Sequence, residues 1–393
     1  MSTVAAPKHE RQLRRDPGVE LARTLACLSV IGCHCWYGTS IAYAYDVSRN
    51  LISCLVADGV AIFWLITGCF LFNNYSYRKT MMRTLKGIVA PLAVYSAVML
   101  LFGADLIEGT FTWAGMFDGG KLRTALKTLL RWRNPVEGYG FVWYLYVYIL
   151  MMVCSPALYG LSWWLDGSRE REAGFLAVTL ALILLNDITC NGTWEFSHAG
   201  INALFPASIE VMWGHILYRH RDELAGKGRW AVYLLVFLGL NLLRMAIQMG
   251  RYQAGTDDDS ILYWYSSIGL ICACCVLLGC CSILGGRRAT APGRFVCWTG
   301  SYTFTVYLLH IPVRNILDNH GFRDGLYAAL VAMLSEGGFA EALYVVGAVA
   351  VVGGVSLVIA IVLRALWRAI RAVVGMIGGR LSHGVEQGSR GGP

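Results

Sequence analysis

The chain has 393 residues, of which 56% are hydrophobic and 15% are charged, and its mean hydropathy is +0.52. Soluble domains contain about 45–50% apolar and about 25% charged residues, so this composition excludes an ordinary soluble enzyme and favours a membrane protein. The net charge is +8, and its distribution between loops, given below, accounts for it without a nucleic-acid partner.

Thirteen cysteines are present, and nearly all fall inside apolar segments. Cys272 and Cys275 form a C-x-x-C pair, but no second pair follows at the spacing of a zinc site. Cysteine inside an apolar helix usually packs as a small hydrophobic residue. We therefore expect neither a metal site nor a disulfide framework.

Apolar windows long enough to cross a bilayer, about 20 residues each, recur along the whole chain. The windows that we interpret as helical spans are 18–38, 52–73, 85–104, 141–164, 173–189, 203–219, 230–248, 261–284, 296–316 and 342–366. The prediction is an all-α polytopic membrane protein with ten transmembrane helices. Its parts are a basic N-terminal segment (1–17), one membrane domain (18–366) and a basic C-terminal tail (367–393).

The positive charges predict how the chain is oriented. With ten spans both termini lie on one side, together with the loops after the even-numbered spans. Most of the 33 Lys and Arg fall in these regions, and the opposite short loops hold few. Because positively charged loops stay in the cytoplasm, both termini are expected to be cytoplasmic, and the basic regions to face anionic lipid.

Ionisable side chains inside spans are energetically costly and are functional candidates for that reason. The predicted spans contain Glu20, Arg23, His34, Asp58, Glu210, His215, Arg244 and His310. Among the acidic residues, Glu20, Asp58 and Glu210 are candidates to support His34. Asp58 and Glu210 have an alternative role, which is to form an ion pair with Arg244.

Arg23 and His34 form the most informative pair. They are eleven residues apart, which at about 100° per residue puts both on one helix face, separated by about 16 Å along the axis. A cation near the cytoplasmic mouth suits an anionic donor, and a deep imidazole suits a general base acting on a hydroxyl. The alternative is a snorkelling arginine and a helix-packing histidine, which spacing alone favours.

Five segments, taken in order, resemble the membrane acyltransferase 3 family. The sequences of that family begin with an acidic residue, an Arg three positions later and a His eleven positions after the Arg. A second helix with the pattern Phe-Phe-x-x-Ser-Gly-x-x-Leu follows, and then a basic pair before a proline. A later helix opens with Trp-Phe-Leu, and a late segment reads Thr-Phe-x-x-Tyr-Leu-x-His. The matching segments are 20–34 (ELARTLACLSVIGCH), 63–71 (FWLITGCFL), 83–91 (RTLKGIVAP), 142–145 (VWYL) and 302–310 (YTFTVYLLH).

The chain departs from the family pattern at two places. Thr67 stands where the family usually has Ser. The second basic residue is Lys86 rather than Arg, and its distance to Pro91 is one residue longer than in the family pattern. Arg78 and Lys79 are therefore rival candidates for the basic pair.

The resemblance implies transfer of an acyl group, usually acetyl, from cytoplasmic acyl-CoA to a hydroxyl of a surface glycan or lipid-linked sugar. It implies a multi-pass protein of a bacterial plasma membrane that uses acetyl-CoA as donor and needs no metal. His34 would be the general base, with Arg23 beside it in the catalytic set. Arg23, Arg83 and Lys86 would hold the polyanionic CoA.

Aromatic residues near the outer face are candidates to hold the sugar acceptor. They are Trp36, Trp143 and Tyr144, and His310 is grouped with them as a substrate contact, although a structural histidine is the more common case there. The alternative for the aromatic residues is the interfacial belt that anchors many membrane proteins.

Two other functions remain open from the sequence. A secondary transporter also combines many spans with intramembrane charges, but nine prolines and no matched halves count against it. A non-catalytic relative that keeps the fold is the second, and the intact Arg23 and His34 pair argues against it. The sequence does not identify the acceptor or the oligomeric state.

Overall fold

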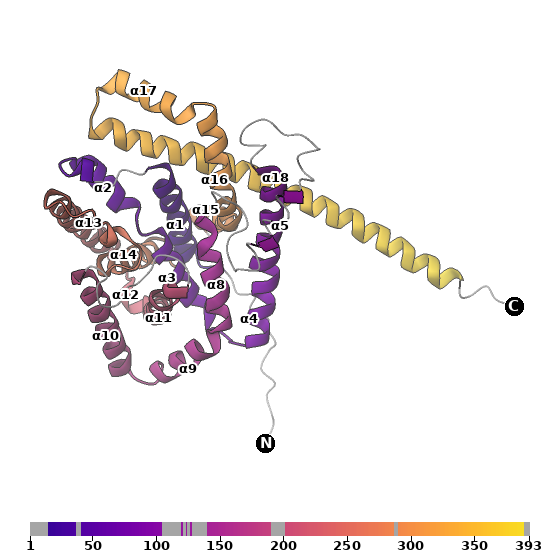
Figure 1. Ribbon diagram of the computed structural model, residues 1–393. Helices are drawn as coiled ribbons and strands as arrows, with labels where there is room; N and C mark the ends of the chain where they lie inside the picture. Colours follow the sequence, from indigo (N-terminus) through magenta and orange to yellow (C-terminus); the bar gives the residue numbers. More distant parts are fainter. Residues whose placement is uncertain are drawn as a thin grey trace.

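The computed structural model describes residues 15–36, 41–103, 119–120, 123, 126–127, 140–189, 201–286 and 290–388. Within these ranges the chain is all-helical and contains no strand, as predicted (Figure 1). Most of the predicted N-terminal basic segment and the end of the tail lie outside the described residues.

The α-helices in chain order are α1 (Pro17–Cys35), α2 (Val47–Val56), α3 (Gly59–Leu71), α4 (Tyr77–Thr84), α5 (Ala90–Val98), α8 (Trp143–Val153), α9 (Ser155–Leu165), α10 (Arg169–Ile188), α11 (Leu204–Arg219), α12 (Arg221–Leu224), α13 (Trp230–Gln253), α14 (Ser267–Leu284), α15 (Ala291–Gly300), α16 (Thr303–Asn319), α17 (Phe322–Leu334) and α18 (Gly338–Gly388). The 3₁₀ turns are Ile41–Tyr43, Gly140–Val142, Ile201–Ala203 and Ser260–Leu262, and the π-helical turns are Leu85–Val89 and Met99–Gly103.

Five described segments are long and apolar enough to cross a membrane. They are Pro17–Cys35, Val47–Leu71, Trp230–Gln253, Ser260–Leu284 and Gly338–Ala372. A sixth is the pair α8 and α9, which bends by 65°. The protein is therefore a helical, multi-pass membrane protein, and the count of ten spans stays a prediction.

Several predicted spans are divided or extended in the structure. The bend between α8 and α9 divides the predicted span 141–164, and Pro156 in the first turn of α9 explains it, because proline cannot donate the backbone hydrogen bond that would continue α8. The predicted span 296–316 is two helices, α15 and α16. The short helix α17 was not predicted, and α18 continues through the predicted boundary at residue 366.

Helix α1 lies in the middle of the bundle (Figure 1). The Asp16 side chain caps its N-terminus by accepting a hydrogen bond from the backbone N–H of Gly18 at 2.9 Å, and Pro17 occupies the first turn, where no N–H is needed. The helix packs against α2, α3, α14, α15, α16 and α18. Any functional side chain on α1 is therefore placed among residues from both halves of the chain.

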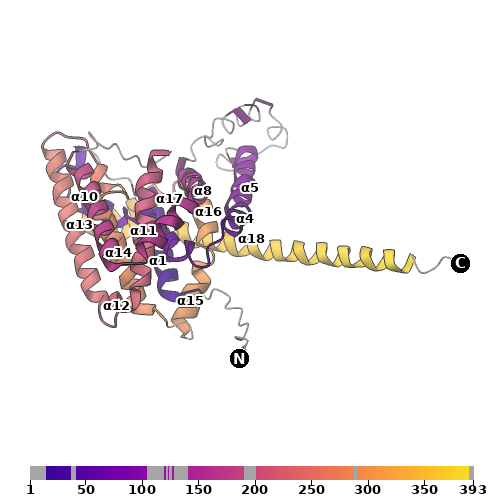
Figure 2. The same cartoon turned by 90° about the horizontal axis from the view of Figure 1, so that it is seen from below.

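The outer surface of the bundle suits lipid. The α13 helix has only 11% of its apolar window buried, and Val232, Leu235 and Leu242 are exposed on it. Figure 2 shows α4 and α5 standing beside the bundle and α18 projecting past it. Some polar and charged side chains are nevertheless buried, among them Glu20 on α1, Asp58 before α3 and Arg244 on α13.

Helices α3 and α11 approach each other through two glycines. A Cβ added to Gly68 would lie 1.8 Å from the carbonyl oxygen of Val211, and one added to Gly214 would lie 2.0 Å from that of Leu65. Small residues of this kind let membrane helices pack backbone to backbone. Gly68 belongs to the second family-like segment, and close packing of α3 against α11 explains why a glycine stands there.

We expect Gly68→Ala to destabilise the fold. The new methyl group displaces backbone rather than a flexible side chain, and overpacking of this kind costs about 1–3 kcal/mol or more. The melting temperature of the purified protein in detergent measures it. Gly239→Ala on the exposed face of α13 is the matched control, because nothing lies within 4 Å of its Cβ position, and a wild-type melting temperature in Gly68→Ala would contradict the packing argument.

Candidate active site

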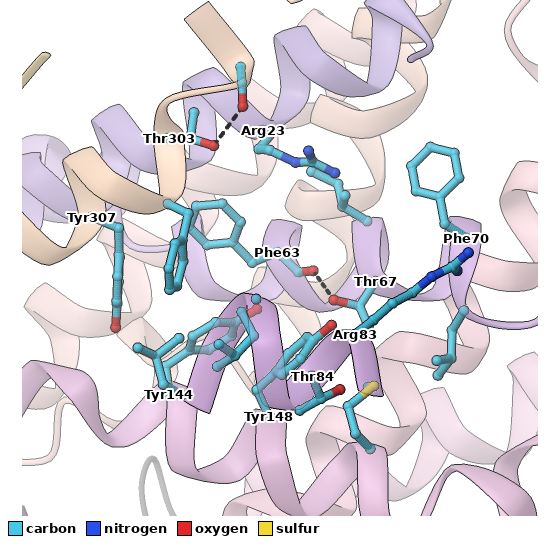
Figure 3. A pocket seen from close by; sticks show the side chains of 18 of the residues that line it. Arg23, Phe63, Thr67, Phe70, Arg83, Thr84, Tyr144, Tyr148, Thr303 and Tyr307 are labelled. Atoms are coloured by element: carbon cyan, nitrogen blue, oxygen red, sulfur yellow. Dashed lines mark hydrogen bonds between the residues drawn. The ribbon is translucent and has the colours of Figure 1, made fainter. Parts of the chain in front are cut away.

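A cavity of about 470 Å³ opens between α1, α3, α4, α8 and the start of α16 (Figure 3). Every one of the five family-like segments contributes to its wall. The contributing residues include Arg23, Thr67, Arg83, Tyr144 and Tyr307. Segments spread over nearly 300 residues of sequence therefore converge on a single space, which makes this cavity the candidate active site.

Arginines gather at one part of the cavity wall. Arg23 Nη1 donates to Glu20 Oε1 at 3.1 Å, and Arg15 Nη1 donates to Glu20 Oε2 at 3.1 Å. Glu20 is only 2% exposed, so its buried carboxylate holds both guanidinium groups at the cavity wall. The spacing of an acidic residue three positions before Arg23 thus orients the arginine along one helix face. Arg83 adds a third positive charge from α4.

The two members of the predicted basic pair have different positions. Arg83 lines the cavity, whereas Lys86 is exposed and absent from its wall. Lys86 lies in the π-helical turn Leu85–Val89, in which each turn holds more residues than an α-turn. This wider turn accommodates the extra residue before Pro91. The rival candidates Arg78 and Lys79 are also exposed and do not line the cavity.

Aromatic rings close the other part of the cavity. Phe63 lies with its ring centre 5.9 Å from that of Tyr144 and 6.4 Å from that of Tyr307, and all three line the space (Figure 3). The Tyr307 hydroxyl donates to the backbone carbonyl of Phe141 at 2.6 Å. We call this contact between Tyr307 and Phe141 the aromatic latch.

His34 lies beyond the aromatic latch and does not line the cavity. The ring of Phe141 contacts Tyr307 at 5.7 Å and His34 at 6.3 Å between ring centres. The ring of His310 lies closer to His34, at 5.2 Å. Arg23 and His34 therefore share α1, as predicted from sequence, but only Arg23 faces the cavity directly.

Two arginines that the sequence analysis missed hold the end of α1. Arg314 Nη1 donates to the backbone carbonyl of His34 at 2.7 Å, and Arg323 Nη1 donates to that of Cys35 at 3.2 Å. Cations at this position stabilise a helix, because its C-terminal carbonyls carry partial negative charge. The signal in the sequence was the spacing of four residues between His310 and Arg314, which puts them on one face of α16.

The three carboxylates proposed to support His34 lie elsewhere. Glu20 binds the two arginines at the cavity. Asp58 Oδ1 accepts from Arg244 Nη2 at 2.8 Å, and both side chains are almost fully buried, at 3% and 0% exposure. Glu210 is buried, and neither of its oxygens has a hydrogen-bond partner in the described part of the chain.

The ion pair of Asp58 and Arg244 joins three helices. Arg244 lies on α13, Asp58 precedes α3, and Arg244 also donates to the carbonyl of Cys54 at 3.3 Å, near the end of α2. The predicted span 52–73 breaks between α2 and α3, and this arginine binds the groups that the break exposes. Of the two roles that sequence left open for Asp58, the structure shows the ion pair.

The aromatic residues predicted to hold the sugar acceptor do not lie together in the structure. Tyr144 lines the cavity. Trp143 instead stacks on Trp264, with ring centres 6.0 Å apart. Trp36 packs beside Tyr344 at the far end of α1 and contributes nothing to the cavity wall.

The comparisons with known proteins agree with this convergence of segments. The model of the acyltransferase 3 family, described as an acyltransferase domain, matches residues 16–365. The chain therefore belongs to this family of membrane acyltransferases. No curated protein and no solved structure matches the chain.

We expect Asp58→Asn to lower the free energy of unfolding by about 3–5 kcal/mol, because it leaves the buried Arg244 guanidinium without a counter-charge. The melting temperature in detergent measures the loss. The double variant Asp58→Leu, Arg244→Met is the control, since removing both charges should recover most of the stability. A wild-type melting temperature for Asp58→Asn would show that the pair has no structural role.

Proposed function

We propose that this protein transfers an acyl group, acetyl in the first place, from cytoplasmic acyl-CoA to a hydroxyl of a surface glycan or lipid-linked sugar. His34 acts as the general base. The observation that carries the proposal is the cavity that all five family-like segments line, with arginines on one part of its wall and aromatic rings that contact one another between the cavity and His34.

The cavity suits an acyl-CoA as donor. Its volume of about 470 Å³ falls in the range of small-molecule sites, about 300–1,000 Å³. The phosphates of CoA would meet Arg15, Arg23 and Arg83, whose guanidinium groups bind phosphate in a planar, charge-assisted geometry. The thin pantetheine arm would then follow the aromatic wall towards the latch.

The chemistry needs one base and a positioned acceptor. His34 takes the proton of the acceptor hydroxyl as its oxygen attacks the thioester carbonyl carbon. The new C–O bond forms, the C–S bond breaks, and the CoA thiolate takes the proton back from the His34 imidazolium. A thioester already has a good leaving group, so positioning and proton transfer account for the rate. The aromatic latch opens for the thioester to reach the ring.

The proposed orientation has the donor and the acceptor on different sides of the membrane. It follows from the positive-inside rule, which for a chain of ten spans predicts that both termini are cytoplasmic. The arginines at the start of α1 then face cytoplasmic CoA. His34 at the other end of the helix faces the outer leaflet of the plasma membrane, where a glycan acceptor is found.

The rival function is transport. The buried ion pair of Asp58 and Arg244 and the buried Glu210 are ionisable groups of the kind that transporters use. The ion pair joins helices, however, and lies outside the cavity wall. Substrate flux in proteoliposomes without acyl-CoA would favour transport over acyl transfer.

His34→Ala is expected to reduce acetyl-CoA-dependent O-acetylation in membranes by at least about 100-fold, because a general base contributes about 10²–10⁴. Mass spectrometry of surface glycans, with and without the protein, would identify the acetylated sugar. His320→Ala is the matched control, since His320 is exposed on the neighbouring helix. Full activity of His34→Ala would refute His34 as the base.

Arg83→Ala is expected to raise the KM for acyl-CoA about tenfold with little change in kcat, because a hydrogen bond to a charged group contributes about 1.5–3 kcal/mol. Lys86→Ala should leave KM within about twofold, since Lys86 lies outside the cavity. Steady-state kinetics on equal amounts of purified protein compare the two. A larger increase of KM in Lys86→Ala than in Arg83→Ala would assign CoA binding to Lys86.

A further inference from the structure

The hydrogen bonding of His310 defines which of its two ring nitrogens carries the hydrogen. Its Nδ1 lies 2.5 Å from the backbone carbonyl oxygen of Tyr307. A carbonyl oxygen only accepts hydrogen bonds, so Nδ1 of the neutral ring carries the hydrogen. The other nitrogen, Nε2, then has a free lone pair and can only accept.

That acceptor is buried and unused. His310 is 1% exposed, and Nε2 has no hydrogen-bond partner in the described part of the chain. Leaving a buried acceptor unsatisfied costs about 1–3 kcal/mol. Buried polar groups are otherwise almost always paired, so this nitrogen is available to accept a hydrogen bond from a neighbouring side chain.

The ring of His34 is in position to be that partner. The two ring centres are 5.2 Å apart, with the ring planes inclined by 42°. An N–H···N hydrogen bond of about 2.9 Å, with about 1.2 Å from each ring centre to its nitrogen, spans about 5.3 Å. The separation of the two rings is thus the one that a hydrogen-bonded pair of imidazoles has when a nitrogen of each ring is turned towards the other, and hydrogen bonds in active sites without substrate are often poorly aligned.

We propose that His310 is the positioning residue for His34, and that its Nε2 accepts a hydrogen bond from a ring N–H of His34. This inference rests on the proposed acyl transfer. The bond leaves the other nitrogen of His34 unprotonated and directed at the acceptor hydroxyl. When His34 takes the proton of the hydroxyl, the resulting imidazolium still donates to His310 and is stabilised by it. The third member of a catalytic triad has this task.

The surroundings of the two rings support a positioning role. Phe141 packs its ring against both histidines, at 6.3 Å and 5.1 Å, in edge-to-face geometry. Arg314, one turn after His310, binds the backbone carbonyl of His34 and so holds the end of α1 against α16. No carboxylate in the described ranges lies within 4 Å of a ring nitrogen of His34. The histidine therefore takes the place that the sequence analysis gave to a carboxylate.

Two substitutions at residue 310 separate positioning from structure. In His310→Asn the amide N–H replaces Nδ1 and keeps the bond to the Tyr307 carbonyl, but nothing replaces Nε2. In His310→Gln the longer side chain places an amide oxygen near the position of Nε2. We expect the Asn variant to lose about 100-fold in kcat, with the KM for acetyl-CoA within about twofold, and the Gln variant to keep at least about a tenth of wild-type kcat.

The measurement is acetyl transfer in detergent or nanodiscs, with melting temperatures to show that both variants are folded. Equal activity of the Asn and Gln variants, at any level, would overturn the positioning role, because a purely structural histidine does not distinguish them. His34→Ala is assayed in parallel. Activity in His34→Ala would refute the proposed mechanism itself. An inactive His34→Ala beside a fully active His310→Asn would refute only the role of His310.

Discussion

The charged contacts at the two ends of α1 set the geometry on which the rest of the site depends. At one end Glu20, almost completely buried, holds Arg23 and Arg15 on the cavity wall. At the other end Arg314 and Arg323 bind the last carbonyls of the helix. The contacts from α16 and α17 therefore hold the C-terminal end of the helix, where His34 lies, while the local contacts of Glu20 orient the two arginines on the cavity wall.

The aromatic latch gives this separation a chemical meaning. A thioester that met water near a strong base would be hydrolysed, and active sites exclude water partly to prevent such side reactions. Tyr307, Phe141 and Phe63 place apolar surface between the open cavity and the histidine pair. The hydroxyl of Tyr307 is satisfied by the backbone carbonyl of Phe141, so the contact between these two residues buries no unpaired hydroxyl. In the proposed mechanism, opening this one contact would both admit the donor and expose the base.

Sequence reasoning succeeded where local pattern determines structure. Arg23 and His34 lie on one helix, as the first apolar window predicts, and the order of the five segments identified the family. It failed where tertiary contacts decide. Nothing in the local pattern shows that a π-turn turns Lys86 away from the cavity, or that Arg244, 186 residues distant, takes Asp58. The close approach of the His310 ring to the His34 ring likewise depends on how α16 packs against α1.

A neutral histidine suits the second position beside His34 better than a carboxylate would. Burying an isolated carboxylate costs several kcal/mol even after the protein relaxes, unless a cation compensates it. The carboxylates of Glu20 and Asp58 illustrate this, because each is bound to arginine. A carboxylate next to His34 would therefore need its own arginine or would take a proton. The Nε2 lone pair of His310 carries no charge, so the hydrogen bond that we propose would orient His34 in an apolar interior without an additional buried ion pair.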